Sequence, residues 1–358
     1  MKTNRNNLVI EEIITDLQLF AGVVVPDNAT DGMMTTRSSE IDGAFQKAND
    51  AKFVEIHKEA LVFDKYLGTA NINAHSGNTV RFPKKVRIAV KNTKLDEGMT
   101  PDPSKISLNF VTGTVEQHGD YVMFTDVALG TSIYDLMSIA REAQAYQAAE
   151  IKNALIRDDI LADTEVAHMF AENNGTAATS AAQITANHKL TVELVRKMVT
   201  VMKRNNIRPA VGNDYVMFIH PDQWFDLTSD PAWAEMHKYA DPTPLMTGEI
   251  GRISGCRFVE TTTTLVTKDG ASGAGVYHAL MLGADAADQI NLAGGGVKTI
   301  GKGLGSGGTS DPLDQRATVG WKFQYGCKVK DPLAVIELMT GSYNSGAVVA
   351  TDPNTADW

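Results

Sequence analysis

The chain has 358 residues, of which 43% are hydrophobic and 21% are charged, a composition typical of a soluble globular protein with more than one subdomain. Its formal net charge of −10 argues against tight, sequence-specific nucleic-acid binding as the main task, but it does not exclude a shell that merely encloses DNA. No apolar run approaches the ~20 residues that a membrane span needs, and the amino terminus does not read as a secretory signal.

The first 50 residues mix short apolar segments with polar stretches, which predicts an arm that packs against other elements. Residues 53–66 follow with the pattern of a short helix that ends before Gly68. We therefore predict that residues 1–74 form an amino-terminal arm with one short helix.

Residues 78–118 predict a long two-stranded arm, a β-hairpin. In its ascending limb, apolar residues alternate with basic ones, which is the period of a strand with two unlike faces. The apolar positions are Val80, Phe82, Val86, Ile88 and Val90. The tip at residues 96–103 is rich in turn residues, and the alternation resumes with Ile106, Leu108 and Phe110. At ~3.3 Å per residue, limbs of about a dozen residues would extend roughly 40 Å. A lone hairpin of that length is marginal in water, so it must lie on another surface.

Charge along this hairpin is segregated. Residues 81–94 carry basic side chains and no acid, whereas the tip is acidic. A neighbouring copy of the chain could use this pattern to set its register. A solvated, Lys-rich edge hairpin is the alternative, and the sequence leaves both interpretations open. The predicted inter-subunit contact residues are Arg81, Lys84, Lys85, Arg87, Asp96 and Glu97.

The longest predicted helix covers residues 132–170, with Ser132 as a plausible N-cap. One apolar face is predicted at helical spacing. Its members are Ile133, Leu136, Met137, Ala140, Ala143, Ala148, Ile151 and Leu155. A second helix is expected over residues 192–205. A strand at residues 211–220 leads into a helix that opens at Pro221.

Further strands are expected over residues 250–260 and 274–282, which gives the middle of the chain an α+β character. Near the end, Val319, Trp321, Phe323 and Tyr325 alternate as in a strand. Residues 333–339 predict another strand, and we expect the two to pair as a hairpin.

No motif predicts catalysis, a cofactor or a metal site. The glycine-rich stretch 294–308 spells two phosphate-loop motifs, but both fail in context. No helix is expected after the GxGxxG spelling at residues 303–308, and Gly303 stands where the GxxxxGK spelling at residues 296–302 needs Ser or Thr for magnesium. A flexible loop is therefore favoured. The histidines are scattered singly, without metal-ligand spacing. Cys256 and Cys327 are expected to be buried thiols of a reduced compartment.

Several ordered segments resemble the major capsid protein of tailed bacteriophages, in the branch typed on a lytic coliphage podovirus and with the Johnson fold. The matching segments are Leu17–Ala21, Glu97–Pro101, Gln117–Val122 with Thr125–Asp126, His220–Gln223, Gly303–Gly305, Asp311–Leu313 and Val319–Lys322. They span residues 17–325 in the family's order, and each is weak alone.

The resemblance implies an α+β fold with an amino-terminal arm, an extended loop, a peripheral domain with a long spine helix, and an axial domain. The implied ranges are 1–74 for the arm with its short helix, 75–119 for the extended loop and 120–180 for the peripheral domain. Residues 181–310 would form the axial domain, 311–345 return strands of the peripheral domain and 346–358 a tail. No catalytic residues carry over from the family.

The function so implied is a coat protein, not an enzyme, that self-assembles into the icosahedral shell enclosing the double-stranded DNA of a tailed phage. Its expected partners are copies of itself in hexamers and pentamers, a separate scaffolding protein, a portal and a decoration protein, with packaged DNA nearby and no membrane. Assembly is expected in the cytoplasm of the bacterial host, without removal of a large amino-terminal domain. An encapsulin-type compartment and, less favoured, a nucleotide-dependent enzyme using residues 294–308 stay open as alternatives.

Overall fold

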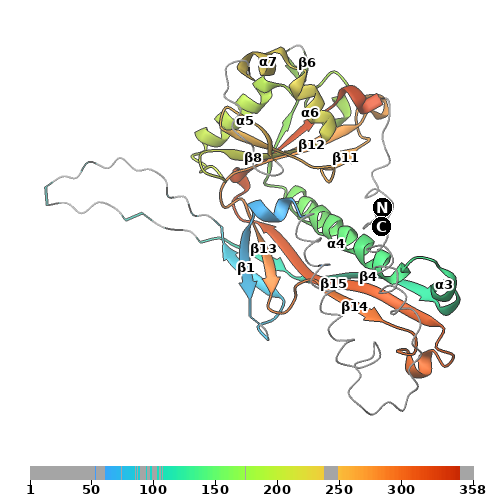
Figure 1. Cartoon of the computed structure of the whole chain (residues 1–358). Coiled ribbons are helices and arrows are strands. Elements are labelled where there is room, and N and C mark those ends of the chain that lie inside the picture. The colour runs from blue at the N-terminus through green and yellow to red at the C-terminus, as the bar shows by residue number, and fades with distance from the viewer. Residues whose placement is uncertain are drawn as a thin grey trace, which may run out of the picture. The chain divides into compact units, whose positions relative to one another are not determined.

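The computed structural model describes residue 53 and residues 61–346, apart from residues 74, 85, 87, 89–93, 95, 96, 99–102, 105, 107, 174 and 238–248. These described residues belong to one compact unit of the chain, which begins at Phe53 (Figure 1). Most of the predicted amino-terminal arm, the tail beyond residue 346 and most of the hairpin tip lie outside the described residues. None of the described helices is long and apolar enough to cross a membrane.

A five-stranded sheet is organised around one long strand, β15 (Arg316–Val329). Its strands run in the order β1-β13-β15-β14, and β4 also pairs with β15. Their bounds are β1 Gly68–Ile72, β4 Glu116–Thr125, β13 Ala287–Leu292 and β14 Lys298–Lys302. The odd-numbered residues of β15 from Ala317 to Val329 are all buried. The strand predicted from its alternating apolar residues is therefore confirmed.

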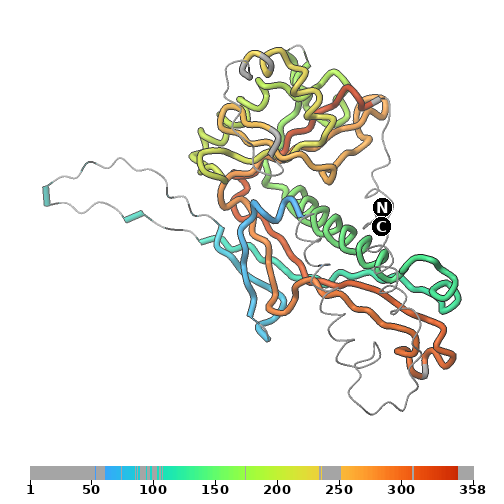
Figure 2. The backbone as a smooth tube through the Cα atoms, viewed as in Figure 1, coloured from blue at the N-terminus to red at the C-terminus, as the bar shows by residue number. Residues whose placement is uncertain are grey.

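One helix, α4 (Leu136–Leu161), packs on this sheet, and Figure 2 shows it beside β4 and β15. It has 26 residues, so the prediction of a helix over 132–170 is wrong at both ends. Asp135 is its N-cap, while Ser132 ends the preceding short helix α3 (Asp126–Thr131). Residues beyond Leu161 leave the helix because Ala167–Phe170 forms β5, which pairs with another strand.

The buried stripe of α4 differs from the predicted apolar face. Ile133 is 96% exposed, whereas the polar residues Gln144, Asn153 and Arg157 are buried. Each of the three has a backbone partner far away in the sequence. The Gln144 amide donates to the Val319 carbonyl at 2.9 Å, and Arg157 Nη1 donates to the Thr263 carbonyl at 2.7 Å. Asn153 Oδ1 accepts from the Val62 N–H at 3.2 Å. These hydrogen bonds make the burial of such groups tolerable, although Gln144 Oε1 is buried without a hydrogen-bond partner among the described residues.

A seven-stranded sheet holds the middle of the chain. Its order is β5-β16-β12-β8-β10-β9, and β11 pairs with β12. The bounds are β8 Tyr215–Ile219, β9 Glu249–Ile253, β10 Cys256–Glu260, β11 Val266–Thr267, β12 Val276–Leu282 and β16 Val335–Thr340. Helices α5 (Val192–Arg204), α6 (Pro221–Thr228) and α7 (Pro231–His237) belong to the same region. The predicted helix over 192–205 and the opening of α6 at Pro221, capped by the His220 side chain, are confirmed.

Three strands of this sheet are joined by the buried carboxylate of Glu337 on β16. It accepts hydrogen bonds from the ring of His278 on β12, at 2.6 Å, and from the ring of His168 on β5. Burial alone would raise the pKa of Glu337, but the hydrogen bonds and charges of His278 and His168 outweigh burial and lower it. The network therefore favours an ionised carboxylate in the interior.

The predicted hairpin between the last two strands is wrong. β15 and β16 lie in different sheets, because the chain turns at Lys330 and Asp331, whose N–H groups both donate to the Ala286 carbonyl. Pro332 then begins a short 3-10 helix that redirects the chain. In addition, β13 and β14 pair in the sheet of β15, although their residues fall in the range predicted for the axial domain. The domain boundaries stay a prediction.

The remaining elements are short. They are the strands β2 Thr79–Pro83, β3 Phe110–Thr114, β6 Glu172–Asn173 and β7 Thr176–Ala177 and the 3-10 helices Phe63–Tyr66, Ala181–Gln183, Ala271–Gly273, Gly308–Ser310, Pro332–Ala334 and Tyr343–Gly346.

Candidate subunit-contact surfaces

The base of the predicted hairpin is a two-stranded ladder. β2 and β3 pair antiparallel from Thr79 opposite Thr114 to Pro83 opposite Phe110. Phe82 is buried against Ile72, Val115 and Ile290, which attaches this base to the five-stranded sheet. The hairpin therefore starts from a fixed position on its own subunit.

Beyond this base, every apolar side chain that the structure describes is exposed. Ile106 is 61% exposed, and the same holds to a smaller degree for Val86, Ile88 and Leu108, while Phe110 at the end of the base is also exposed. Alternating apolar residues that stay in water on both limbs form a surface without a partner within the described chain. The prediction that one subunit cannot bury this hairpin agrees with these exposures.

The structure describes three of the six predicted contact residues. Arg81 is exposed on β2, opposite Thr112, and Glu97 is exposed in a turn. Lys84 instead forms an ion pair with Glu165 of the same subunit at 2.5 Å, which occupies the charge that was predicted to face a neighbour. Lys85, Arg87 and Asp96 lie outside the described residues, and the whole set stays a prediction.

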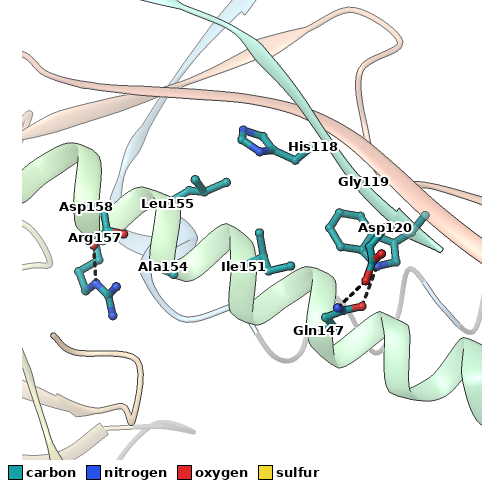
Figure 3. Close-up of a pocket in the computed structure, with 10 residues that line it drawn as sticks. His118, Gly119, Asp120, Gln147, Ile151, Ala154, Leu155, Arg157 and Asp158 are labelled. Carbon is teal, nitrogen blue, oxygen red and sulfur yellow. Dashed lines mark hydrogen bonds and ion pairs between the residues drawn. The ribbon is translucent and has the colours of Figure 1, made fainter. Parts of the chain in front are cut away.

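A groove that sequence reasoning missed lies between α4 and β4, with a volume of about 540 Å³ (Figure 3). Its apolar side is formed by Ile151, Ala154 and Leu155 of the helix. The remaining lining is polar or aromatic: His118, Gly119, Asp120, Gln147, Arg157, Asp158 and Trp321. An apolar floor with a polar rim suits a side chain or an extended segment better than bulk water.

One end of the groove is fixed by a hydrogen-bond chain. The Trp321 indole N–H donates to Gln147 Oε1 at 3.2 Å, and the Gln147 amide donates to Asp120 Oδ2 at 2.8 Å. The other oxygen of Asp120 accepts the backbone N–H of Tyr121 at 2.8 Å. Helix α4 and the two strands are thereby held in a defined separation.

The strand that borders this groove has an open edge. Within the described chain, β4 pairs only with β15. Tyr121, Val122 and Met123 are three consecutive exposed apolar residues on it. That run was the one signal in the sequence that could have indicated this surface.

The glycine-rich segment does not form the predicted loop throughout. Residues 298–302 are strand β14. Lys302, which is the lysine of the GxxxxGK motif spelled by residues 296–302, lies opposite Thr318 of β15. The element that follows is a three-residue 3-10 helix at Gly308–Ser310, too short to present a row of amide groups to a phosphate. This geometry disfavours the nucleotide-dependent alternative.

The two cysteines are buried free thiols, as predicted. Burial raises the pKa of Cys327 to about 12 and raises that of Cys256 as well, so neither is a reactive thiolate. In the described residues, His, Cys, Asp and Glu form no group of three that could hold a metal ion.

Comparisons with known proteins point to one kind of protein. Residues 142–300 match the family model described as phage capsid protein. No curated protein matches the sequence. The matching family is one of phage capsids, which favours a genome-enclosing shell over the encapsulin alternative.

Solved structures extend the match over most of the chain. The capsid of Ralstonia phage GP4 has a TM-score of 0.59 at 16% identity, covering 79% of this chain and 89% of that one. The capsid of Helicobacter pylori bacteriophage KHP30 has a TM-score of 0.59 at 12% identity, covering 78% and 91%. The cyanophage Pam1 capsid has a TM-score of 0.56 at 15% identity, covering 90% and 97%. The resemblance found in the sequence is confirmed: this chain matches the phage capsid protein family over residues 142–300 and has the fold of phage major capsid proteins.

Proposed function

We propose that this chain is a major capsid protein that self-assembles into the icosahedral shell around the double-stranded DNA of a tailed phage. The observation that carries the proposal is the exposed apolar hairpin on a capsid fold. Isolated exposed apolar residues need no explanation, but an alternating set on both limbs of one hairpin does. A structural role, without catalysis, fits this surface.

In this proposal the hairpin of one subunit lies across a neighbouring subunit. Fully burying one Leu or Ile side chain is worth about 1.5–3 kcal/mol, so half-exposed residues such as Leu108 gain a fraction of that each. Individually modest contacts repeated around a closed shell become strong together, because each later contact forms within one assembly. Curvature and closure then come from many weak contacts.

The further partners belong to the same proposal. The shell would contain hexamers and pentamers of this chain, would be built with a scaffolding protein and a portal in the cytoplasm of the bacterial host, and would carry a decoration protein outside. The net charge of −10 fits a shell that encloses DNA without binding it tightly. The podovirus-type branch stays a prediction.

The test is sedimentation velocity and negative-stain microscopy of the full chain, expressed alone and together with the genes that neighbour it. Closed shells or curved sheets tens of nanometres across in either expression support the proposal. A monomer or small oligomer in both expressions would overturn it.

A further inference from the structure

The five-stranded sheet has two unlike faces. Trp321 of β15 is buried toward α4, where its indole bonds to Gln147 of that helix. Because side chains alternate along a strand, the even-numbered residues of β15 point away from α4, and we call this side the far face. At its β13 end the far face is covered, since Phe82 of β2 packs on Ile290 of β13. Around Lys322 it is exposed to solvent, so this part of the face is open.

The open part of the far face extends over three strands, β4, β15 and β14, which lie side by side (Figure 1). Residues directly opposite each other in an antiparallel ladder share a face. The β14 residues opposite even-numbered positions of β15 are Lys298, Ile300 and Lys302. On β4 the matching positions include Tyr121 and Met123. All five side chains are exposed, so they form one continuous surface.

This surface carries basic side chains and no acidic one. Its charged residues on the three strands are Lys298, Lys302, Arg316 and Lys322. The two acids of β4, Glu116 and Asp120, lie opposite buried residues of β15 and therefore on the α4 side. None of the four basic side chains forms an ion pair with another described residue. Positive charge is thus concentrated on one face of a chain whose net charge is −10.

Two of these lysines, Lys298 and Lys322, lie directly opposite each other. Like charges at directly opposite positions of a ladder repel and destabilise the sheet. Gly119, which lies opposite Lys322 on the β4 side, offers no side chain that could compensate. A negatively charged partner would relieve this repulsion.

Apolar side chains fill the centre of the same surface. Tyr121 is 66% exposed and Ile300 is 40% exposed, and Gly320 lies between them, opposite both. Lys302 flanks this row on one side and Lys322 flanks it on the other. An apolar centre with a charged rim is the composition of a protein–protein interface.

Charge complementarity selects an acidic partner, and the apolar centre decides between two acidic classes. Nucleic acid offers phosphates, but aliphatic side chains such as Ile300 and Met123 gain little from them, and base stacking requires aromatic rings. Tyr121 is the one aromatic residue among the exposed positions of this surface. A protein that displays apolar side chains among carboxylates matches both properties.

We propose that the far face of β4, β15 and β14 binds an acidic protein, different from this chain, that presents apolar side chains between its carboxylates. The proposed contacts between copies use the hairpin, which leaves this surface available to another protein. With strands ~4.8 Å apart and residues ~3.3 Å apart, the surface measures roughly 15 by 20 Å. That is well below the ~800 Å² per partner of a stable interface, so one subunit binds weakly and a partner that contacts several subunits binds more tightly.

Fluorescence anisotropy of labelled peptides, titrated with the unassembled full chain, tests the inference. One peptide of about 16 residues, long enough to cross the surface, alternates Glu and Tyr. A second peptide alternates Glu and Ser, which keeps the charge and removes the apolar side chains. We expect the Glu–Tyr peptide to bind at least tenfold more tightly than the Glu–Ser peptide, and we expect added salt to weaken its binding. Equal binding of the two peptides, or no binding of either, would overturn the inference.

The decisive variant is Lys298→Glu. It lowers the positive charge of the surface but turns a like-charge pair with Lys322 into an opposite-charge pair, so the melting temperature should stay the same or rise. Binding of the Glu–Tyr peptide should fall at least tenfold. Lys268→Glu is the matched control, because it reverses an exposed lysine outside this sheet, and it should bind the peptide like wild type. Equal affinities of Lys298→Glu and Lys268→Glu would contradict the inference.

Two further outcomes would assign the surface to another occupant and overturn the inference. Duplex or single-stranded DNA that binds more tightly than the Glu–Tyr peptide, and loses this binding in Lys298→Glu, would make nucleic acid the partner. Particles that form from wild type but not from Lys298→Glu would make the surface a contact between copies of the chain. Because the peptide titration uses unassembled subunits, its result does not depend on whether the chain forms a shell.

Discussion

The side-chain amide of Gln147 on α4 donates a hydrogen bond to the Asp120 carboxylate on β4 at 2.8 Å, and the same amide accepts from the indole of Trp321 on β15. One neutral side chain thus connects the helix to two strands at the end of the groove. Asp120 in turn occupies the N–H of Tyr121 on the open edge.

Replacing Gln147 with Ala should destabilise the subunit by about 1–3 kcal/mol, because the buried indole N–H of Trp321 loses its acceptor. Urea unfolding followed by tryptophan fluorescence measures the change. Gln147→Glu is the matched control: it keeps the acceptor for Trp321 but places a second carboxylate beside Asp120. Equal stability of Gln147→Ala and wild type would show that this bridge contributes nothing.

Gly326 should not tolerate a side chain. A Cβ at this position would lie 2.2 Å from the Thr114 carbonyl oxygen, where β15 passes the end of β3. We expect Gly326→Ala to lower the melting temperature by several degrees and to reduce assembly, because the hairpin base is attached at this crossing. Gly296→Ala is the control, since a Cβ added there would meet no atom within 4 Å among the described residues. Similar melting temperatures for the two variants would contradict the close approach.

The stability of the subunit should depend on Asp159 of α4. Burial raises the pKa of this carboxyl from 3.8 to about 6, and the opposing effects of Lys328 and the Cys327 N–H do not cancel it. The folded state therefore binds the proton more tightly than the unfolded state, and stability from this group falls as the pH rises from about 4 to 6. Asp159→Asn should raise the melting temperature at pH 7.5 by about 2–4 °C. The gain should disappear near pH 4, and a gain that is the same at both pH values would contradict this assignment.

The hairpin should matter for assembly and not for folding. Leu108→Asp places a charge on a side chain that is 57% exposed, so the fold loses little, whereas a contact that buries this position would lose several kcal/mol. Particle yield by sedimentation velocity should fall strongly, with an unchanged melting temperature. Leu108→Ile is the conservative control.

Charge reversal tests the basic limb in the same way. The double variant Arg87→Glu with Lys91→Glu should impair assembly more than subunit folding. Normal particles from this variant would count against the role of the hairpin charges.

Local patterns predicted the elements well where the pattern needs only near neighbours. The alternation of Val319 and Trp321 indicated β15, and Pro221 indicated the start of α6. Partners across the fold were not predictable in this way. An alternating strand pairs equally well with any strand, so β15 and β16 were assigned to each other although they lie in different sheets.

The face of α4 was misjudged for a related reason. Gln144 and Arg157 look like surface residues until the Val319 and Thr263 carbonyls that satisfy them are known. The groove and the open edge of β4 depend on that packing. The sequence therefore indicated the hairpin surface but neither this groove nor this open edge.

The most direct test of the account is a cryo-electron microscopy reconstruction of particles assembled from this chain, with or without the products of the neighbouring genes. The account predicts a closed shell in which the hairpin of each subunit, from Lys84 to Asn109, lies against a neighbouring subunit and buries Ile106 and Leu108. A closed shell whose hairpins stay exposed or fold back on their own subunit would contradict it, as would the absence of any shell.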